Sequence, residues 1–196
     1  MGSRLRWHFP TPIIEVDLEG FDARQKRLAL KLGALRDGEK GINRSNRGGW
    51  HSPNNLHKVI DDDISWLIAE CLGSARRHVE YACHHVTIER AVCTSAWAVI
   101  NGAGDWNAPH IHLPFDWSGV VYVQAEEGDK GGDLVFFNPF PFYEASQREA
   151  SVTYKAKQGK MILFPSFLTH MVTPYAGQLP RMSVAFNARM VLESKP

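Results

Sequence analysis

The chain has 196 residues, of which 44% are hydrophobic and 22% are charged. This length fits one domain that can bury a hydrophobic core. The formal net charge is only +1, which argues against a nucleic-acid-binding protein, because such proteins need a strongly basic surface. The three cysteines, Cys71, Cys83 and Cys93, have no regular spacing, so we interpret them as ordinary buried thiols.

No long apolar run suggests a membrane span. The first 17 residues are interrupted by two arginines and two prolines, so they lack the apolar stretch of a secretory signal peptide. The sequence therefore predicts a cytoplasmic protein.

The first 85 residues predict mainly helices. Residues 7–18 indicate an edge strand, because two prolines restrict this segment to a sheet margin. Residues 21–36 predict a helix with leucines spaced along one buried face. After a Gly-, Asn- and Arg-rich loop at 38–53, residues 61–82 predict the clearest helix. There an apolar stripe of 3.6-residue period follows three aspartates, which favour a helix N-terminus.

The rest of the chain predicts short strands. They cover residues 87–100, 118–124, 133–137, 150–154, 160–164 and 181–191. Helices followed by short strands indicate an α+β fold, in which the helices pack outside a jelly-roll core. We expect one domain over residues 1–196, with helical support at about 20–85 and the β core at about 86–191.

Three histidines have the spacing of a metal site. His110 and His112 form an HxH pair, and His170 ends a later apolar run. Residues two apart in an extended strand point to the same face, so one strand can present both members of the pair to one metal. Imidazole suits iron, zinc, copper and nickel, so histidines alone do not identify the metal.

A candidate anion clamp follows the third histidine. Within residues 181–187, Arg181 and Ser183 share one parity with other small or polar residues, whereas the alternate positions are apolar. A strand that buries its apolar face elsewhere would turn Arg181 toward a lumen, where its guanidinium can bind a carboxylate through two hydrogen bonds. The alternative is an ordinary surface arginine.

These motifs together resemble a family. The matching segments are residues 46–52, 109–112, 117–123, 163–170 and 181–187. In this ordered set the sequence resembles the 2-oxoglutarate- and Fe(II)-dependent oxygenases, in particular a bacterial and phage branch, from about Phe9 to Asn187. The resemblance implies a double-stranded β-helix, also called a jelly roll or cupin-like fold, with iron at its open end.

The resemblance also implies a function and a set of site residues. Fe(II) would be held by the catalytic residues His110, His112 and His170, and the co-substrate 2-oxoglutarate by Arg181, Ser183, Asn101 and Tyr122. The implied reaction uses dioxygen, converts 2-oxoglutarate to succinate and carbon dioxide, and hydroxylates an unactivated C–H bond of a small molecule or amino acid.

The third ligand departs from the family pattern. His112 stands where most members have a carboxylate. Asp116 is the alternative, because it shares the parity of the two histidines and would complete a two-His, one-carboxylate triad. Pro114 interrupts the strand between them, which makes parity a poor guide there.

The substrate side of the site is less defined by sequence. Trp50, Trp106 and Trp117 are candidates for a substrate wall, with core packing as the alternative for each. The segment 41–53 is a candidate lid, since Gly48 and Gly49 permit unusual backbone conformations, and its His51 is a further candidate for the site.

Two other functions stay open at this stage. One is a three-His enzyme that does not use 2-oxoglutarate, either with zinc or as a cupin-type dioxygenase. The other is a jelly-roll binding module without catalysis. As partners we expect a small-molecule substrate and O2 but neither nucleic acid nor membrane, and a homodimer is compatible with the sequence.

Overall fold

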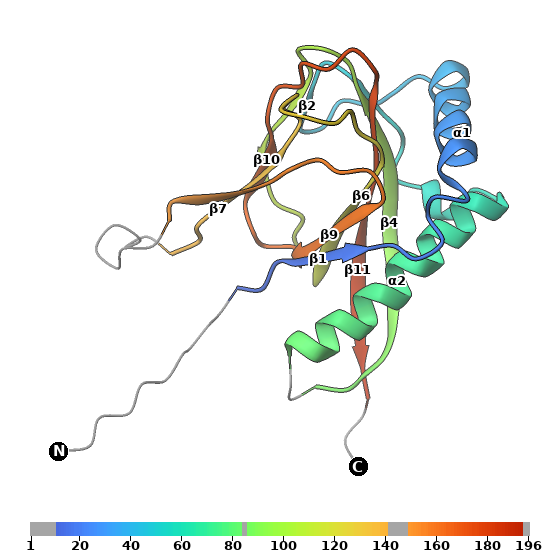
Figure 1. The fold of residues 1–196 in the computed structure, drawn as a ribbon. Coiled ribbons are helices and arrows are strands. Elements are labelled where there is room, and N and C mark those ends of the chain that lie inside the picture. The colour runs from blue at the N-terminus through green and yellow to red at the C-terminus, as the bar shows by residue number, and fades with distance from the viewer. Residues whose placement is uncertain (1–10, 84–85, 141–148, 194–196) are drawn as a thin grey trace.

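The structure is a computed structural model that describes residues 11–83, 86–140 and 149–193. The predicted start of the first strand, at 7–10, lies outside this part. Two antiparallel sheets face each other, and the two α-helices lie beside the larger sheet (Figure 1). No helix within the described residues is long and apolar enough to cross a membrane.

The larger sheet has six strands. Their spatial order is β1 (Ile14–Asp17), β9 (Lys160–Pro165), β6 (Trp117–Gln124), β11 (Arg181–Leu192), β4 (Ile88–Asn101) and β3 (Trp50–His51). The prediction of an edge strand near the N-terminus is confirmed by β1, which lies at the sheet margin and, among the described strands, pairs only with β9.

The smaller sheet has five strands. Their order is β2 (Asn46–Arg47), β5 (Trp106–His110), β10 (His170–Val172), β7 (Leu134–Phe137) and β8 (Ser151–Tyr154). Within this sheet β10 lies between β5 and β7, and His170 of β10 pairs directly with His110 of β5. The pairing thus brings two segments that are 60 residues apart in sequence to one point.

The helices α1 (Gln25–Gly38) and α2 (Asp62–Ala82) cover the outer face of the six-stranded sheet (Figure 1). A short 3-10 helix, Leu56–Lys58, precedes α2. The side chain of Asp61 caps α2 by accepting hydrogen bonds from the backbone N–H groups of Asp63 and Ile64, each at 3.0 Å. Such a cap satisfies donors that the first helical turn leaves free.

Strand β11 separates two environments by alternation. Its residues Met182, Val184, Phe186 and Ala188 belong to the hydrophobic core under the helices. Its residues Arg181, Ser183, Ala185 and Asn187 face the space between the two sheets. A side-chain period of two explains how one strand serves both the core and a polar lumen.

Four short strands were not predicted from the sequence: β2, β3, β5 and β10. They contain only two to five residues each, and β5 includes Pro109. Such strands form because a neighbouring strand offers hydrogen bonds, so their own residue preferences carry little signal.

The segment at 41–53 is tied to both sheets. Through β2 it pairs Asn46 with Asn107 of the smaller sheet, and through β3 it pairs His51 with Val99 of the larger one. At Gly48 the backbone has φ of +71° and a Cβ atom would collide with the Asp105 carboxylate, so glycine is required there. The predicted loop is therefore a paired wall that bridges the sheets.

Candidate metal centre and co-substrate pocket

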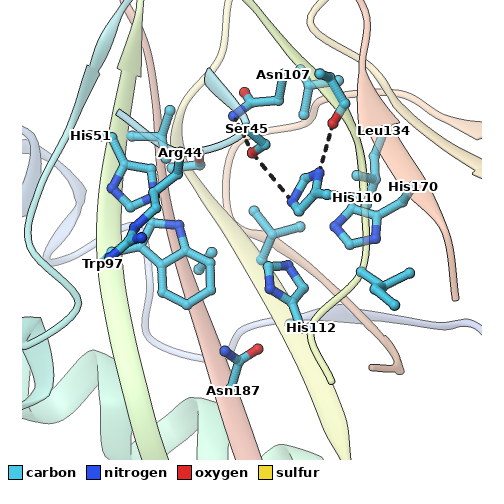
Figure 2. A pocket seen from close by; sticks show the side chains of 18 of the residues that line it. Arg44, Ser45, His51, Trp97, Asn107, His110, His112, Leu134, His170 and Asn187 are labelled. Atoms are coloured by element: carbon cyan, nitrogen blue, oxygen red, sulfur yellow. Dashed lines mark hydrogen bonds between the residues drawn. The ribbon is translucent and has the colours of Figure 1, made fainter. Parts of the chain in front are cut away.

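A cavity of about 750 Å³ opens between the two sheets (Figure 2). Its walls come from β4, β5, β6 and β11, from β10, and from the bridging segment that contains Arg44 and His51. Three of the predicted site histidines line it, and so do Arg181 and Ser183. Cavities of this size are typical of sites for small ligands.

The three histidines converge at one point in this cavity. Among the described residues, His110, His112 and His170 form a group whose ligand nitrogens all lie within 4.8 Å of one another. The rings of His110 and His170 are 4.3 Å apart between centroids, and that of His112 lies 4.9 Å and 5.0 Å from them. His110 ends β5, His170 begins β10, and His112 lies two residues beyond β5.

Two of the imidazoles are held in a defined tautomer. Nδ1 of His110 lies 2.8 Å from the carbonyl oxygen of Ala108, and Nδ1 of His170 lies 2.9 Å from that of Leu168. A carbonyl only accepts, so both Nδ1 atoms carry the proton and both Nε2 atoms have a lone pair. The Nε2 of His110 lies 3.4 Å from the Ser45 hydroxyl, which can donate a weak hydrogen bond to it. This is the arrangement by which proteins orient histidines that bind metals.

The same imidazoles are poised to be neutral. Burial lowers the pKa of His110, and burial together with the other two histidines lowers the pKa of His170 well below its ordinary value. For His112 the pKa falls to about 3, chiefly because of burial. Metal binding requires neutral imidazole, so the cluster meets this requirement at neutral pH.

Asp116 points away from the cluster. Its Oδ2 accepts a hydrogen bond from the backbone N–H of Met190 at 2.8 Å. The cavity lining includes His112 but not Asp116. The geometry therefore favours His112 over Asp116 as the third candidate ligand.

Arg181 is the clearest electrostatic anomaly of the site. Arg181 is only 1% exposed to solvent. Within the described part of the chain it forms no ion pair with a carboxylate, its Nε has no hydrogen-bond partner, and Nη1 donates only to Ser183 Oγ at 3.3 Å. Since an unpaired buried charge is costly, the pocket fits an anionic ligand that completes it.

Tyr122 and Asn101 lie beside this guanidinium. Asn101 is the strand partner of Arg181, and the Arg181 guanidinium lies 5.0 Å from the centre of the Tyr122 ring. The Tyr122 hydroxyl and both side-chain polar atoms of Asn101 are buried without a hydrogen-bond partner in the described structure. The four predicted co-substrate residues thus lie close together, and three of them have buried polar atoms without a hydrogen-bond partner. Of the four, only Arg181 and Ser183 line the cavity.

The three tryptophans predicted for a substrate wall lie elsewhere. Trp117 is buried in the core under the helices, and Trp50 packs against that core while its Nε1 donates to the carbonyl of Glu39 at 2.9 Å. Trp106, on β5, is half-buried and is not part of the cavity lining.

Trp97 takes the place expected of those tryptophans. Its ring stacks on His51 with 5.7 Å between centroids and lies 5.3 Å from the ring of His112. Sequence reasoning missed it because position 97 falls within a continuous apolar strand, where a tryptophan is indistinguishable from a core residue. The available signal was its position: Trp97, Val99 and Asn101 are two residues apart on one strand, so Trp97 shares a face with Asn101, a predicted site residue.

Comparison with known proteins connects this geometry to a family. Residues 95–187 match a family model described as "Putative 2OG-Fe(II) oxygenase". The matched segment includes the three histidines, Arg181 and Ser183. A comparison of the sequence with curated proteins gives no match.

Solved structures share the fold at low identity. A prolyl-4-hydroxylase from Pseudomonas putida has a TM-score of 0.66 at 15% identity, covering 90% of this chain and 92% of that one. A viral collagen prolyl hydroxylase from Paramecium Bursaria Chlorella virus-1, in complex with 2-oxoglutarate, has a TM-score of 0.57 at 16% identity and covers 91% and 96%. The 2-oxoglutarate-dependent epimerase SnoN, from nogalamycin biosynthesis, has a TM-score of 0.65 at 13% identity and covers 90% and 76%.

These findings confirm two of the predictions made from sequence. The resemblance to 2OG-Fe(II) oxygenases holds over the β-strand half of the chain, and the jelly-roll fold holds over nine tenths of it. The description of the matched family also names Fe(II) and 2-oxoglutarate, which agrees with the predicted metal and co-substrate.

Proposed function

We propose that this chain, whose β-strand half matches the 2OG-Fe(II) oxygenase family, is an Fe(II)- and 2-oxoglutarate-dependent dioxygenase. One observation carries the proposal: three convergent neutral imidazoles and one buried, acid-free guanidinium share a single cavity. A metal and an anion are the two ligands that such a cavity fits. 2-Oxoglutarate, a dicarboxylate that can also chelate a metal, supplies the anion.

In this proposal His110, His112 and His170 would hold Fe(II), and the Nε2 atoms of His110 and His170 are the ones available for it, since their Nδ1 atoms donate to backbone carbonyls. When bound, the iron supplies the oxidising chemistry with dioxygen and 2-oxoglutarate, while the protein supplies orientation and exclusion of water. Three neutral ligands cancel none of the metal's charge, whereas a carboxylate would cancel part of it. The site should therefore attract an anionic co-substrate more strongly than a two-His, one-carboxylate site does.

Arg181 and Ser183 bind the distal carboxylate of 2-oxoglutarate in this assignment. A guanidinium matches a carboxylate through two parallel hydrogen bonds, and the pocket around it excludes water. Tyr122 and Asn101 complete the pocket, since each has buried polar atoms that lack a partner.

The reaction we propose is hydroxylation of a C–H bond in a small molecule or amino acid. Prolyl hydroxylases and an epimerase share the fold, so the fold alone permits several outcomes for the oxidised substrate. We further propose that residues 1–196 form one domain that acts in the cytoplasm and does not bind nucleic acid, in keeping with the net charge of +1.

The test is succinate formation from 2-oxoglutarate under air, measured with Fe(II) and, separately, with Zn(II). We expect succinate only with Fe(II), and we expect it to disappear in His170→Ala. A protein that binds metal but never consumes 2-oxoglutarate would instead be a three-His enzyme of another kind.

A further inference from the structure

Arg44 is a cation without a partner on the cavity wall. It lines the cavity at the start of the bridging segment and is exposed. Its guanidinium forms no hydrogen bond and no ion pair within the described part of the chain. Only its backbone is engaged: the N–H donates to Asn46 Oδ1 at 2.8 Å, and the carbonyl oxygen accepts from Arg47 Nη1 at 3.4 Å. Figure 2 shows its side chain lying beside His51 and reaching toward Trp97.

Arg47, three residues later, provides a contrast. It also lines the cavity and is also exposed, but its Nη1 donates to the carbonyl oxygens of Arg44, Ser45 and Asn46. Arg47 thus stabilises the turn through these hydrogen bonds, whereas the Arg44 guanidinium stabilises no part of the described chain by a hydrogen bond or ion pair.

The charge of Arg44 acts on the cavity and is not cancelled there. His51 has a lowered pKa, mainly because of burial, and the positive charge of Arg44 lowers it further. Among the described residues that line the cavity there are three arginines and no Asp or Glu. A cavity of this kind concentrates anions.

Arg44 is distinct from the proposed co-substrate clamp. Arg181 is buried beside Tyr122 and Gly132, whereas Arg44 is exposed at the mouth beside His51. One dicarboxylate that chelates the metal and reaches Arg181 leaves Arg44 free for another molecule.

An apolar rim accompanies the arginine at the mouth. The residues on either side of His112 line the cavity and are unusually exposed for their type: Ile111 at 45% and Leu113 at 60%. Phe115 extends this rim. Exposed apolar residues that gather beside a site mark a surface for a ligand.

We propose that the oxidised substrate carries an anionic group, a carboxylate or a phosphate, which Arg44 binds, and an apolar portion that rests on Ile111 and Leu113. This inference rests on the proposed function, since it names the class of substrate of that same site. It makes Arg44 a specificity-determining residue, and it places the bound molecule over the His51–Trp97 stack that lies against His112.

The test is calorimetric binding of matched pairs of probes to the full chain, without and with saturating 2-oxoglutarate and Mn(II). One pair is N-acetyl-L-leucine and its neutral amide; the other is isopentyl phosphate and isopentanol. We expect the anionic member of at least one pair to bind about tenfold more tightly than its neutral partner. The pair that shows the preference tells carboxylate from phosphate.

Variants separate the two halves of the proposed surface. Arg44→Gln should abolish the preference for the anion, whereas Arg90→Gln, which removes an exposed arginine on β4 outside the cavity lining, should preserve it. Leu113→Ala should weaken both members of a pair equally, by roughly fivefold.

Three results would overturn the proposal: equal affinity within both pairs, no binding of either anion, or a preference that survives Arg44→Gln. Failure of the proposed function would look different. The wild-type protein would then not bind 2-oxoglutarate in the presence of metal, whatever its preference among the probes.

Discussion

Two regions of this molecule treat buried charge in opposite ways. Under the helices, Asp63 is 3% exposed and receives Arg24 at 2.7 Å, Arg27 at 3.0 Å and Lys31 at 3.3 Å. Between the sheets, Arg181 is 1% exposed and has no acidic partner in the described part of the chain.

We interpret the difference as one between a charge that serves the fold and a charge that is proposed to serve a ligand. Asp63 is satisfied within the chain. Arg27 and Lys31 come from α1 and Arg24 directly precedes it, so the three cations hold that helix against α2. Arg181 has no such set of partners among the described residues, and because an unpaired buried charge is costly, it supports the proposal that an anionic ligand binds there. The three convergent histidines, of which His110 and His170 have Nδ1 protonated by their contacts with backbone carbonyls, follow the same reasoning for a metal.

The largest effect on turnover should come from removing one of the three histidines in the cavity between the sheets. His170→Ala removes one of three converging nitrogens, and we expect 2-oxoglutarate turnover to fall by at least a thousandfold. Metal binding measured by calorimetry should weaken in parallel, because removal of a ligand lowers metal affinity.

The matched control is Asp116→Asn. Asp116 is engaged with the Met190 backbone and lies outside the cavity lining, so this variant should keep its turnover. Loss of turnover in Asp116→Asn together with normal turnover in His112→Ala would make Asp116 the third ligand.

The next largest effect should come from Arg181, the proposed binding group for the carboxylate of 2-oxoglutarate. Arg181→Gln should raise the 2-oxoglutarate concentration needed for half-maximal turnover by roughly 30-fold to several thousandfold, since loss of one partner of a buried charge pair costs about 2–5 kcal/mol. Arg189→Gln, on the same strand but exposed, should change it little. An unchanged requirement in Arg181→Gln would place the clamp elsewhere.

Much of this site was accessible from sequence, and the reasons are specific. The parity of Arg181 and Ser183 against Met182 and Val184 predicted a strand with one polar face, and the structure shows such a strand. The long helix at 61–82 was equally clear, because its apolar period and its capping aspartate agree.

What sequence missed depends on contacts between distant segments. Strands β2 and β3 exist because β5 and β4 offer them partners, and nothing in a Gly- and Arg-rich stretch predicts that pairing. The same pairing brings Arg44 and His51 to the cavity. Trp97 was missed because periodicity shows which residues share a face but not which face meets the cavity.

Without added ligands, substitutions of Asp63 and of Arg181 should change the stability of the protein in different directions. Asp63→Asn should lower the free energy of unfolding by about 1 kcal/mol, after allowance for the solvent exposure of its arginine and lysine partners. Arg181→Met should leave it unchanged or raise it, because the variant removes an unpaired buried charge. Urea unfolding measures both, and a similar loss in both variants would show that Arg181 has a partner inside the protein.

The difference in unfolding free energy between the wild-type protein and Asp63→Asn should also depend on pH. Hydrogen bonds from Arg27, opposed by burial, and then from Arg24 and Lys31 hold the pKa of Asp63 well below its usual value. A depressed carboxyl pKa stabilises the fold above its unfolded value of roughly 4, and this stabilisation is lost as the pH falls below it. The gap between wild type and Asp63→Asn should therefore narrow in acid.

The smallest effect tests whether the bridging segment is a wall or a lid. Trp50→Phe removes the hydrogen bond from Trp50 Nε1 to the Glu39 carbonyl but keeps an aromatic ring against the core. We expect a loss of about 0.5 kcal/mol in unfolding free energy, since the bond is partly exposed. The ratio of 2-oxoglutarate consumed to product formed should stay at its wild-type value, because β2 and β3 fasten the segment to both sheets. A higher ratio at unchanged stability would mean that the segment moves over the site during turnover, as a lid does.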